Sequence, residues 1–245
     1  MHNWSARKDV PLGLMKEIAQ ERLVRVPTAG VALEGNLALT GGASGIVLFA
    51  HGSGSSRQSP RNRLVAEYLR QRSLGTLLID LLTPDEEQVD EYTRHLRFDI
   101  ELLARRLAGA AEWLSGNAGT RDLRIGYFGA STGAAAALVA AARSPRQIGA
   151  IVSRGGRPDL AGPELPGVLA PTLLIVGGDD VPVIQMNQEA YAQLRVEKQI
   201  KIIPGASHLF EEPGALEQVA RLAADWFLRW LPEAAVFFRK TPKTR

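Results

Sequence analysis

The sequence predicts an α/β protein built on a doubly wound, mostly parallel sheet of about eight strands. Three observations support this fold class. Short, continuously apolar segments alternate with segments of helical periodicity, a pattern typical of parallel strands that helices cover on both faces. An alternating apolar pattern near the N-terminus indicates an antiparallel hairpin. The chain has 245 residues, which fits one large domain of this class.

Composition excludes several classes of protein. Apolar residues make up 45% of the chain and charged residues 22%, so the chain can bury a core and disorder is excluded as its main state. The net charge is +3, and basic residues cluster only in the C-terminal tail, which does not indicate nucleic-acid binding. The chain has no cysteine, which excludes a disulfide scaffold and thiol catalysis. It has neither a signal sequence nor an apolar run of membrane length, so we expect a cytoplasmic protein without a membrane partner.

The predicted domain covers residues 21–232, between an N-terminal extension (1–20) and a basic C-terminal tail (233–245). The tail carries four basic residues, Arg239, Lys240, Lys243 and Arg245. A solvated terminus is favoured there over a partner site.

The hairpin opens the domain. A short strand over residues 23–26 leads through a turn at 28–30 into a strand whose apolar residues share one parity. These residues are Val31, Leu33, Leu37 and Leu39.

Six apolar segments then predict the parallel strands: 46–50, 76–80, 125–129, 148–153, 172–178 and 198–203. Helical spacing of apolar residues indicates helices around Val65–Leu69, Ile100–Leu114 and Leu216–Trp230. Active sites of such sheets lie beyond the carboxyl ends of the strands, so functional residues are expected there.

A Gly-x-Ser-x-Gly motif at 129–133 follows one of these strands and opens an alanine-rich helix. Its glycines allow a sharp turn that projects the hydroxyl of Ser131 above the sheet. The helix N-terminus would offer the backbone N–H of Thr132 to a developing negative charge. A Gly/Ser-rich loop with a serine N-cap is the alternative, but the position between strand and helix favours a nucleophile.

Four histidines are candidates for the base that such a serine needs. His2 lies in the N-terminal extension, His95 is expected on a solvated helix, and His51 ends the strand 46–50. His208 follows the last strand in a loop of small residues that leaves its imidazole accessible. The chain order Ser, Asp, His also favours His208 as the base.

A carboxylate that orients this histidine is expected beyond the strand 172–178, where Asp179 and Asp180 lie. Adjacent side chains in a turn point apart, so only one of the two can face His208, and we favour Asp180. A metal site is the alternative, but no His or Glu lies at ligand spacing from this pair.

The glycine-rich segment after the strand 46–50 can bring a second N–H, that of Ser53, to the same negative charge. A dinucleotide loop is the alternative, since Gly52 and Gly54 follow a strand and the acidic Asp80 ends the next one. Arg57 replaces the third glycine of that fingerprint, and Pro60 interrupts where the helix should begin.

The sequence resembles the α/β-hydrolase superfamily and, within it, the dienelactone-hydrolase-like proteins. The resemblance covers about residues 20–232. Six segments carry it: HGSGSSR (51–57), LLIDLLTPDEE (77–87), GASTG (129–133), SRGGRPDL (153–160), LLIVGGDDVPVI (173–184) and PGASHLFEEPG (204–214).

The resemblance implies a catalytic triad of Ser131, Asp180 and His208, with Ser53 and Thr132 supplying the N–H groups of the oxyanion hole. Dienelactone hydrolases proper use a cysteine nucleophile, which this chain lacks, so a dienelactone substrate is not implied. Similar domains also occur fused to phosphoribosyltransferases, and a chain of this length is too short to hold both.

The expected function is therefore hydrolysis of a small-molecule carboxylic ester, lactone or thioester through an acyl-enzyme, without a cofactor. A non-catalytic binding protein and an acyltransferase are the alternatives.

Two further expectations concern access to the site. Only residues 154–170 separate two successive strands at the point where many relatives insert a cap domain, so no large cap is expected. Arg57, Arg154 and Arg157 follow carboxyl ends of strands, where they could bind a substrate carboxylate. The favoured alternative is that they brace loops, for example through an ion pair of Arg157 with Asp159 or Asp99.

Overall fold

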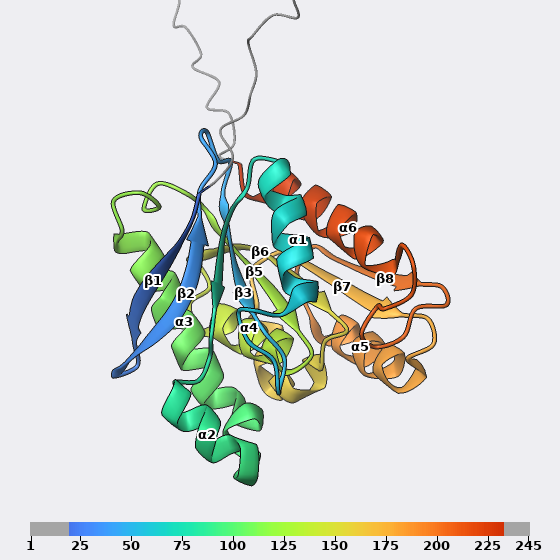
Figure 1. Cartoon of the computed structure of the whole chain (residues 1–245). Helices are drawn as coiled ribbons and strands as arrows, with labels where there is room; N and C mark the ends of the chain where they lie inside the picture. Colours follow the sequence, from blue (N-terminus) through green and yellow to red (C-terminus); the bar gives the residue numbers. More distant parts are fainter. Residues whose placement is uncertain (1–19, 233–245) are drawn as a thin grey trace, which may run out of the picture.

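The described chain forms one sheet of eight strands. Figure 1 shows this sheet running through the protein between helices. The computed structural model describes residues 20–232. The strands are β1 (Glu21–Thr28), β2 (Val31–Ala38), β3 (Ile46–Ala50), β4 (Gly75–Ile79), β5 (Ile125–Ala130), β6 (Ile148–Arg154), β7 (Thr172–Gly177) and β8 (Lys198–Ile203). Their order in the sheet is β1-β2-β4-β3-β5-β6-β7-β8. The β1–β2 and β2–β4 pairs are antiparallel and all others are parallel, which confirms the predicted fold class.

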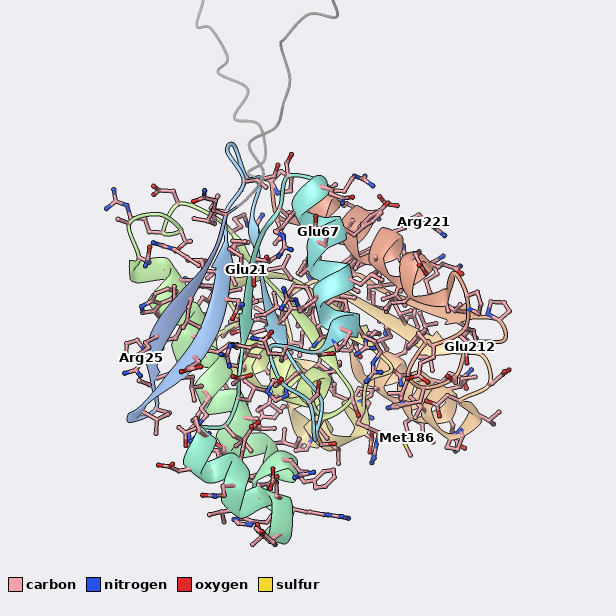
Figure 2. All side chains as sticks on the ribbon, in the orientation of Figure 1. Glu21, Arg25, Glu67, Met186, Glu212 and Arg221 are labelled. Atoms are coloured by element: carbon pink, nitrogen blue, oxygen red, sulfur yellow. The ribbon has the colours of Figure 1, made fainter. Side chains whose placement is uncertain are left out.

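Helices cover both faces of the sheet (Figure 1). The helices α1 (Pro60–Gln71) and α6 (Ala215–Trp230) pack on one face, where Glu67 and Arg221 mark them in Figure 2. The helices α3 (Ile100–Gly116), α4 (Thr132–Arg143) and α5 (Val181–Gln193) pack on the other. A buried apolar cluster fills the space on each side. This double cover explains why the central strands are apolar throughout.

The β1–β2 hairpin has the predicted tight turn. Ala29 and Gly30 both adopt positive φ, 46° and 81°, the backbone geometry that suits a two-residue hairpin turn. The pairing runs from Thr28 opposite Val31 to Glu21 opposite Ala38, so β1 is longer than the predicted strand.

The expectation that His95 lies on a helix is wrong. His95 is exposed, between α2 (Pro84–Thr93) and the short 3-10 helix η1 (Leu96–Phe98). The buried carboxylate of Asp90 accepts hydrogen bonds from the backbone N–H groups of Leu96 and Arg97. Backbone N–H groups that bond to a side chain cannot form the next hydrogen bonds of the helix. The helix α2 therefore ends before His95.

No cap domain follows β6. The segment between β6 and β7 contains the 3-10 segment η2 (Pro158–Gly167), which is interrupted by the non-helical Gly162. The expected absence of a large insertion at this point is therefore confirmed for the described chain.

The predicted extension, apart from Gln20, and the predicted basic tail lie outside the described residues. Within residues 20–232, no helix combines the length and the hydropathy that crossing a bilayer requires.

Candidate active site

The register of the parallel strands brings the predicted site residues to one edge of the sheet. The last residue of β3, Ala50, lies opposite Gly129 in β5, and Gly129 lies opposite Ser153 in β6. The loops that follow these strands therefore meet at their carboxyl ends.

Ser131 sits in a strained turn between β5 and α4. Its φ of 49° and ψ of −120° lie in a region that L-residues rarely adopt. Two backbone hydrogen bonds hold the turn: the Ser131 N–H donates to the carbonyl of Arg154 at 3.3 Å, and the Arg157 N–H donates to the Ser131 carbonyl at 3.1 Å. Such strain persists only where the surroundings over-determine it, and it is common at functional sites.

Gly133 lets the start of α4 approach β3. A Cβ at this position would collide with the backbone carbonyl oxygens of Ala50 and His51. Neither oxygen can move without shifting the strand or the loop that follows it. The second glycine of the motif is therefore required for packing as well as for the turn.

Gly133→Ala is expected to lower the free energy of unfolding by about 2 kcal/mol or more, because overpacking against backbone cannot relax. Thermal denaturation should show a drop in Tm of about 4 °C or more. Gly116→Ala is the matched control, since a Cβ on this α3 residue meets nothing within 4 Å. Its Tm should stay unchanged or rise slightly. Equal Tm values for the two variants would contradict the close packing at Gly133.

Asp180 and His208 form a hydrogen-bonded pair. The Nδ1 atom of His208 lies 2.6 Å from Oδ2 of Asp180. The Asp180 side chain is 14% exposed, whereas Asp179 is exposed and forms no side-chain hydrogen bond or ion pair with His208. The loop that carries His208 connects β8 to α6, where Glu212 is labelled in Figure 2. Of the two adjacent carboxylates, the structure thus brings the favoured one to the histidine.

The loop that carries His208 lies next to the segment that holds the Ser131 turn. The Cε1 atom of its ring is 3.6 Å from the position that a Cβ on Gly155 would take. Gly155 follows Arg154, whose carbonyl accepts the hydrogen bond from the Ser131 N–H. The turn at Ser131 and the loop that carries His208 are therefore neighbours.

The glycine-rich loop after β3 packs against the same serine. A Cβ built on Gly52 would lie 3.1 Å from the Cβ of Ser131. The backbone N–H groups of Ser53 and Thr132 have no hydrogen-bond acceptor among residues 20–232. Both groups are therefore free to bind a negatively charged oxygen at this place.

His51 has a structural role that the sequence did not reveal. Its Nε2 accepts a hydrogen bond from the Leu81 N–H at 3.0 Å, and its Nδ1 pairs with the Gly52 carbonyl at 2.9 Å. Burial lowers the pKa of His51, which agrees with a neutral ring that donates from Nδ1. The imidazole therefore links the β3 loop to the end of β4 and is not available as a base.

Arg57 is fully engaged by other side chains. Its guanidinium forms ion pairs with Asp80 and with Glu34, the latter at 2.6 Å, and donates to Oδ1 of Asn36 at 3.0 Å. The Arg57 backbone N–H also donates to Asp80 at 2.6 Å. This arrangement favours the bracing interpretation of Arg57. It also disfavours the dinucleotide loop, since the carboxylate that would contact a ribose is occupied.

The two arginines after β6 differ from each other. Arg157 forms a two-point ion pair with Asp159 at 2.9 and 2.7 Å, as the bracing alternative predicted. Arg154 is 7% exposed and has no carboxylate partner among residues 20–232.

A cavity of about 600 Å³ lies beside the β3 loop. Its walls include Ser53, Thr132, the start of α1 and one side of α2. The contribution of α2 was not predicted, although the Thr83–Glu86 capping box that begins this helix is readable in the sequence. Within residues 20–232, no group of three or more acidic or histidine side chains is arranged to hold a metal.

Comparison with known proteins identifies the family. The model of the Dienelactone hydrolase family matches residues 77–233. This chain belongs to the dienelactone hydrolase family. It is also 63% identical to a dienelactone hydrolase from Anabaena variabilis, whose crystal structure superposes with a TM-score of 0.87 over 88% of this chain and 100% of that one. The predicted family and fold are thus confirmed.

Other relatives differ in length or only share the fold. A Mycobacterium tuberculosis protein provisionally named a phosphoribosyl transferase is 56% identical over 205 residues, 84% of this chain and 45% of that protein. The chain thus spans about half the length of the curated relatives it matches. An esterase of Pyrococcus furiosus is 20% identical, with a TM-score of 0.69 over 87% of this chain and 94% of that one, which shows the common fold alone.

Proposed function

We propose that this member of the dienelactone hydrolase family is a serine hydrolase that cleaves a carboxylic ester, lactone or thioester through an acyl-enzyme. The observation that carries the proposal is the 2.6 Å pair of His208 and Asp180 beside the strained turn of Ser131. A carboxylate on Nδ1 fixes the imidazole tautomer that leaves Nε2 free to accept a proton.

In the first half of the reaction, Oγ of Ser131 attacks the carbonyl carbon of the substrate while its proton passes to Nε2 of His208. The carbonyl oxygen becomes negatively charged. The N–H groups of Ser53 and Thr132 stabilise this oxyanion, and the N-terminal end of α4 adds a favourable dipole. Asp180 stabilises the imidazolium. When the tetrahedral intermediate collapses, the leaving group takes the proton from His208.

In the second half, His208 removes a proton from water, and the resulting hydroxide attacks the acyl carbon. The same two N–H groups hold the second oxyanion. Collapse returns the proton to Oγ of Ser131 and releases the carboxylic acid. Water is the acceptor here, whereas an acyltransferase would use another nucleophile at this step.

The name of the Mycobacterium tuberculosis relative suggests a different activity, but it describes a protein more than twice as long as the matched segment. Phosphoribosyl transfer needs a site for a pyrophosphate group and no serine nucleophile. The Ser131–His208–Asp180 arrangement supports acyl chemistry, so we assign ester hydrolysis to this chain.

Purified protein is expected to react with a fluorophosphonate and to hydrolyse p-nitrophenyl esters, with the highest kcat/KM at acyl chains of about two to six carbons. The physical reason is the 600 Å³ cavity, a size typical of small-molecule sites, together with the missing cap domain. Initial rates across a chain-length series provide the measurement.

A preference for acyl chains longer than about ten carbons would contradict the inferred short substrate. Labelling without turnover in water, but with turnover in the presence of added alcohols or amines, would favour the acyltransferase. Absence of both labelling and turnover would favour a binding protein.

A further inference from the structure

Asn187 is a buried polar residue of α5, the helix on which Met186 is labelled in Figure 2, and the proposed mechanism does not use it. It is 0% exposed, and its side-chain nitrogen Nδ2 donates two hydrogen bonds. One goes to the carbonyl of Gly156 at 3.0 Å and the other to the carbonyl of Val183 at 2.8 Å. The side-chain oxygen Oδ1 has no hydrogen-bond partner among residues 20–232. Because an unpaired buried acceptor is costly, the two bonds of Nδ2 are the reason to look for a role of this residue.

The bond to Gly156 reaches the turn of Ser131 through a single peptide group. The carbonyl of Gly156 and the N–H of Arg157 belong to the same planar unit. That N–H donates to the carbonyl of Ser131 at 3.1 Å. The side chain of Asn187 and the backbone of Ser131 are therefore bound to opposite sides of one rigid group.

The segment 154–157 holds Ser131 on both sides. At its start, the carbonyl of Arg154 accepts a hydrogen bond from the Ser131 N–H at 3.3 Å, and at its end the peptide 156–157 donates to the Ser131 carbonyl. Within residues 20–232, the Gly156 carbonyl accepts a hydrogen bond from Asn187 alone. Loss of this donor would leave the end of the segment without its side-chain support.

The packing around Gly156 is tight. A Cβ at this position would collide with Oγ of Ser153 and come within 2.7 Å of the Cβ of Ala134 in α4. The peptide 156–157 thus lies directly against the start of the helix that follows Ser131. A backbone at a φ of 49° persists only where its surroundings hold it, and this contact together with the bond from Asn187 contributes to that hold.

The second hydrogen bond of Asn187 reaches the helix that carries the proposed acid. Val183 lies in the first turn of α5, and Asp180 is the N-cap residue of the same helix. The carboxylate of Asp180 lies 2.6 Å from Nδ1 of His208. A single NH₂ group therefore binds both the first turn of the acid's helix and the peptide that holds the nucleophile.

We propose that Asn187 is a positioning residue, whose two hydrogen bonds fix the turn of Ser131 relative to the helix that begins at Asp180. The proposal rests on the proposed hydrolase function. Proton transfer requires Oγ of Ser131 within hydrogen-bond distance of His208, and Asp180 orients that histidine. A small shift between the turn and α5 lengthens this contact, and rates fall steeply with such shifts. Asn187 does not line the cavity, so it acts through the other residues.

Asn187→Leu tests the proposal, because leucine is similar in size but donates no hydrogen bond. The rate constant of fluorophosphonate labelling at saturation should fall by about 10-fold or more, and kcat for a short p-nitrophenyl ester should fall with it. The fluorophosphonate concentration at half-saturation and KM should change by less than about threefold, since no residue of the cavity is altered.

A purely structural role of Asn187 would give a different result. It would lower Tm and the fraction of molecules that react, but each reactive molecule would react at the wild-type rate. Intact-protein mass spectrometry after exhaustive labelling measures that fraction. All rates are therefore expressed per reactive site, at a temperature well below the Tm of every variant.

Thr120→Val is the matched control. Thr120 is 1% exposed, and its hydroxyl donates to the carbonyl of Leu114 at 2.6 Å. It lies between α3 and β5, before the amino end of that strand and therefore away from the site edge. This variant also loses a buried hydrogen bond from a side chain to the backbone. Tm should fall in both variants, whereas the labelling rate per reactive site should fall in Asn187→Leu alone.

An unchanged labelling rate per reactive site in Asn187→Leu would overturn the proposal, and so would an equal loss in Thr120→Val. A rise in KM without a change in kcat would also overturn it, because it would assign Asn187 to the shape of the cavity. If Asn187→Leu does not fold, Asn187→Ala removes the same donor without adding bulk, and the same criteria apply.

Failure of the hydrolase function itself is distinguishable, because the wild type then reacts with neither the ester nor the fluorophosphonate. Amide hydrogen exchange followed by NMR needs no turnover. In Asn187→Leu, the N–H groups of Ser131 and Arg157 should exchange about 10-fold or more faster than in the wild type. The N–H of Phe128, inside β5, reports the loss of overall stability and should accelerate less. Equal acceleration at all three residues, or none, would contradict the positioning role whether or not the protein is a hydrolase.

Discussion

Ser131→Ala is expected to abolish covalent labelling by a fluorophosphonate and to lower kcat by about 10³-fold or more. The physical reason is the loss of the hydroxyl oxygen that forms the acyl-enzyme in the proposed mechanism. The oxyanion N–H groups and the cavity remain, so a small residual rate above that of water is expected. Intact-protein mass spectrometry after labelling and steady-state kinetics with a short p-nitrophenyl ester give the two measurements.

Ser144→Ala is the matched control, because Ser144 lies at the far end of the same helix, α4. It should label and turn over like the wild type. Persistent labelling of Ser131→Ala at another serine would contradict the assignment of the nucleophile.

Ser131→Gly separates catalysis from backbone strain. It should be as inactive as Ser131→Ala, yet more stable by about 1 kcal/mol or more, because glycine adopts a φ of 49° without steric cost. A higher Tm for Ser131→Gly than for Ser131→Ala would show that the backbone of the turn at residue 131 is strained.

The sheet and most of the site edge could be predicted from the sequence because they depend on local patterns. The segments 46–50 and 125–129 are short and carry no charged residue, a pattern typical of strands buried on both faces. Once these strands are parallel, the loops that carry Ser131, Asp180 and His208 must meet at one edge. Their proximity thus follows from topology rather than from any single motif.

The difference between Arg57 and Arg154 could not be predicted, because their contacts join residues far apart in the chain. Arg57 is paired with Glu34 of β2 and with Asp80 after β4, and Arg154 contacts Asn62 of α1. In the sequence, both are arginines that follow a strand. Only the packing of α1 and of the hairpin against the sheet shows which of them has a counter-charge.

The helix that follows β4 could not be predicted from the sequence patterns either. The surface helix α2 is largely polar, and Asp90 is its one buried residue, so apolar periodicity gives no signal there. Its end is determined by the side chain of Asp90 accepting backbone hydrogen bonds from Leu96 and Arg97. The part of the cavity wall that α2 forms, with Glu87 and Glu91, therefore became visible only in the structure.

Asp180→Asn is expected to lower kcat by about 10²- to 10⁴-fold, whereas Asp179→Asn should change it by less than about threefold. The two substitutions make the same change in charge and composition one residue apart, so each is the control for the other. Asp180 lies 2.6 Å from Nδ1 of His208, while Asp179 is exposed.

In the Asp180→Asn variant, the new side-chain amide can donate to Nδ1 of His208 through its NH₂ group, which would favour the tautomer that carries the proton on Nε2. That tautomer cannot accept the proton of Ser131, and the imidazolium would also lose its carboxylate. Both effects slow the formation of the acyl-enzyme, so fluorophosphonate labelling should slow down along with kcat while Tm changes little. A loss from Asp179→Asn that equals or exceeds the loss from Asp180→Asn would transfer the orienting role to Asp179. In that case the hydrogen bond between Asp180 and His208 would not be the one that supports catalysis.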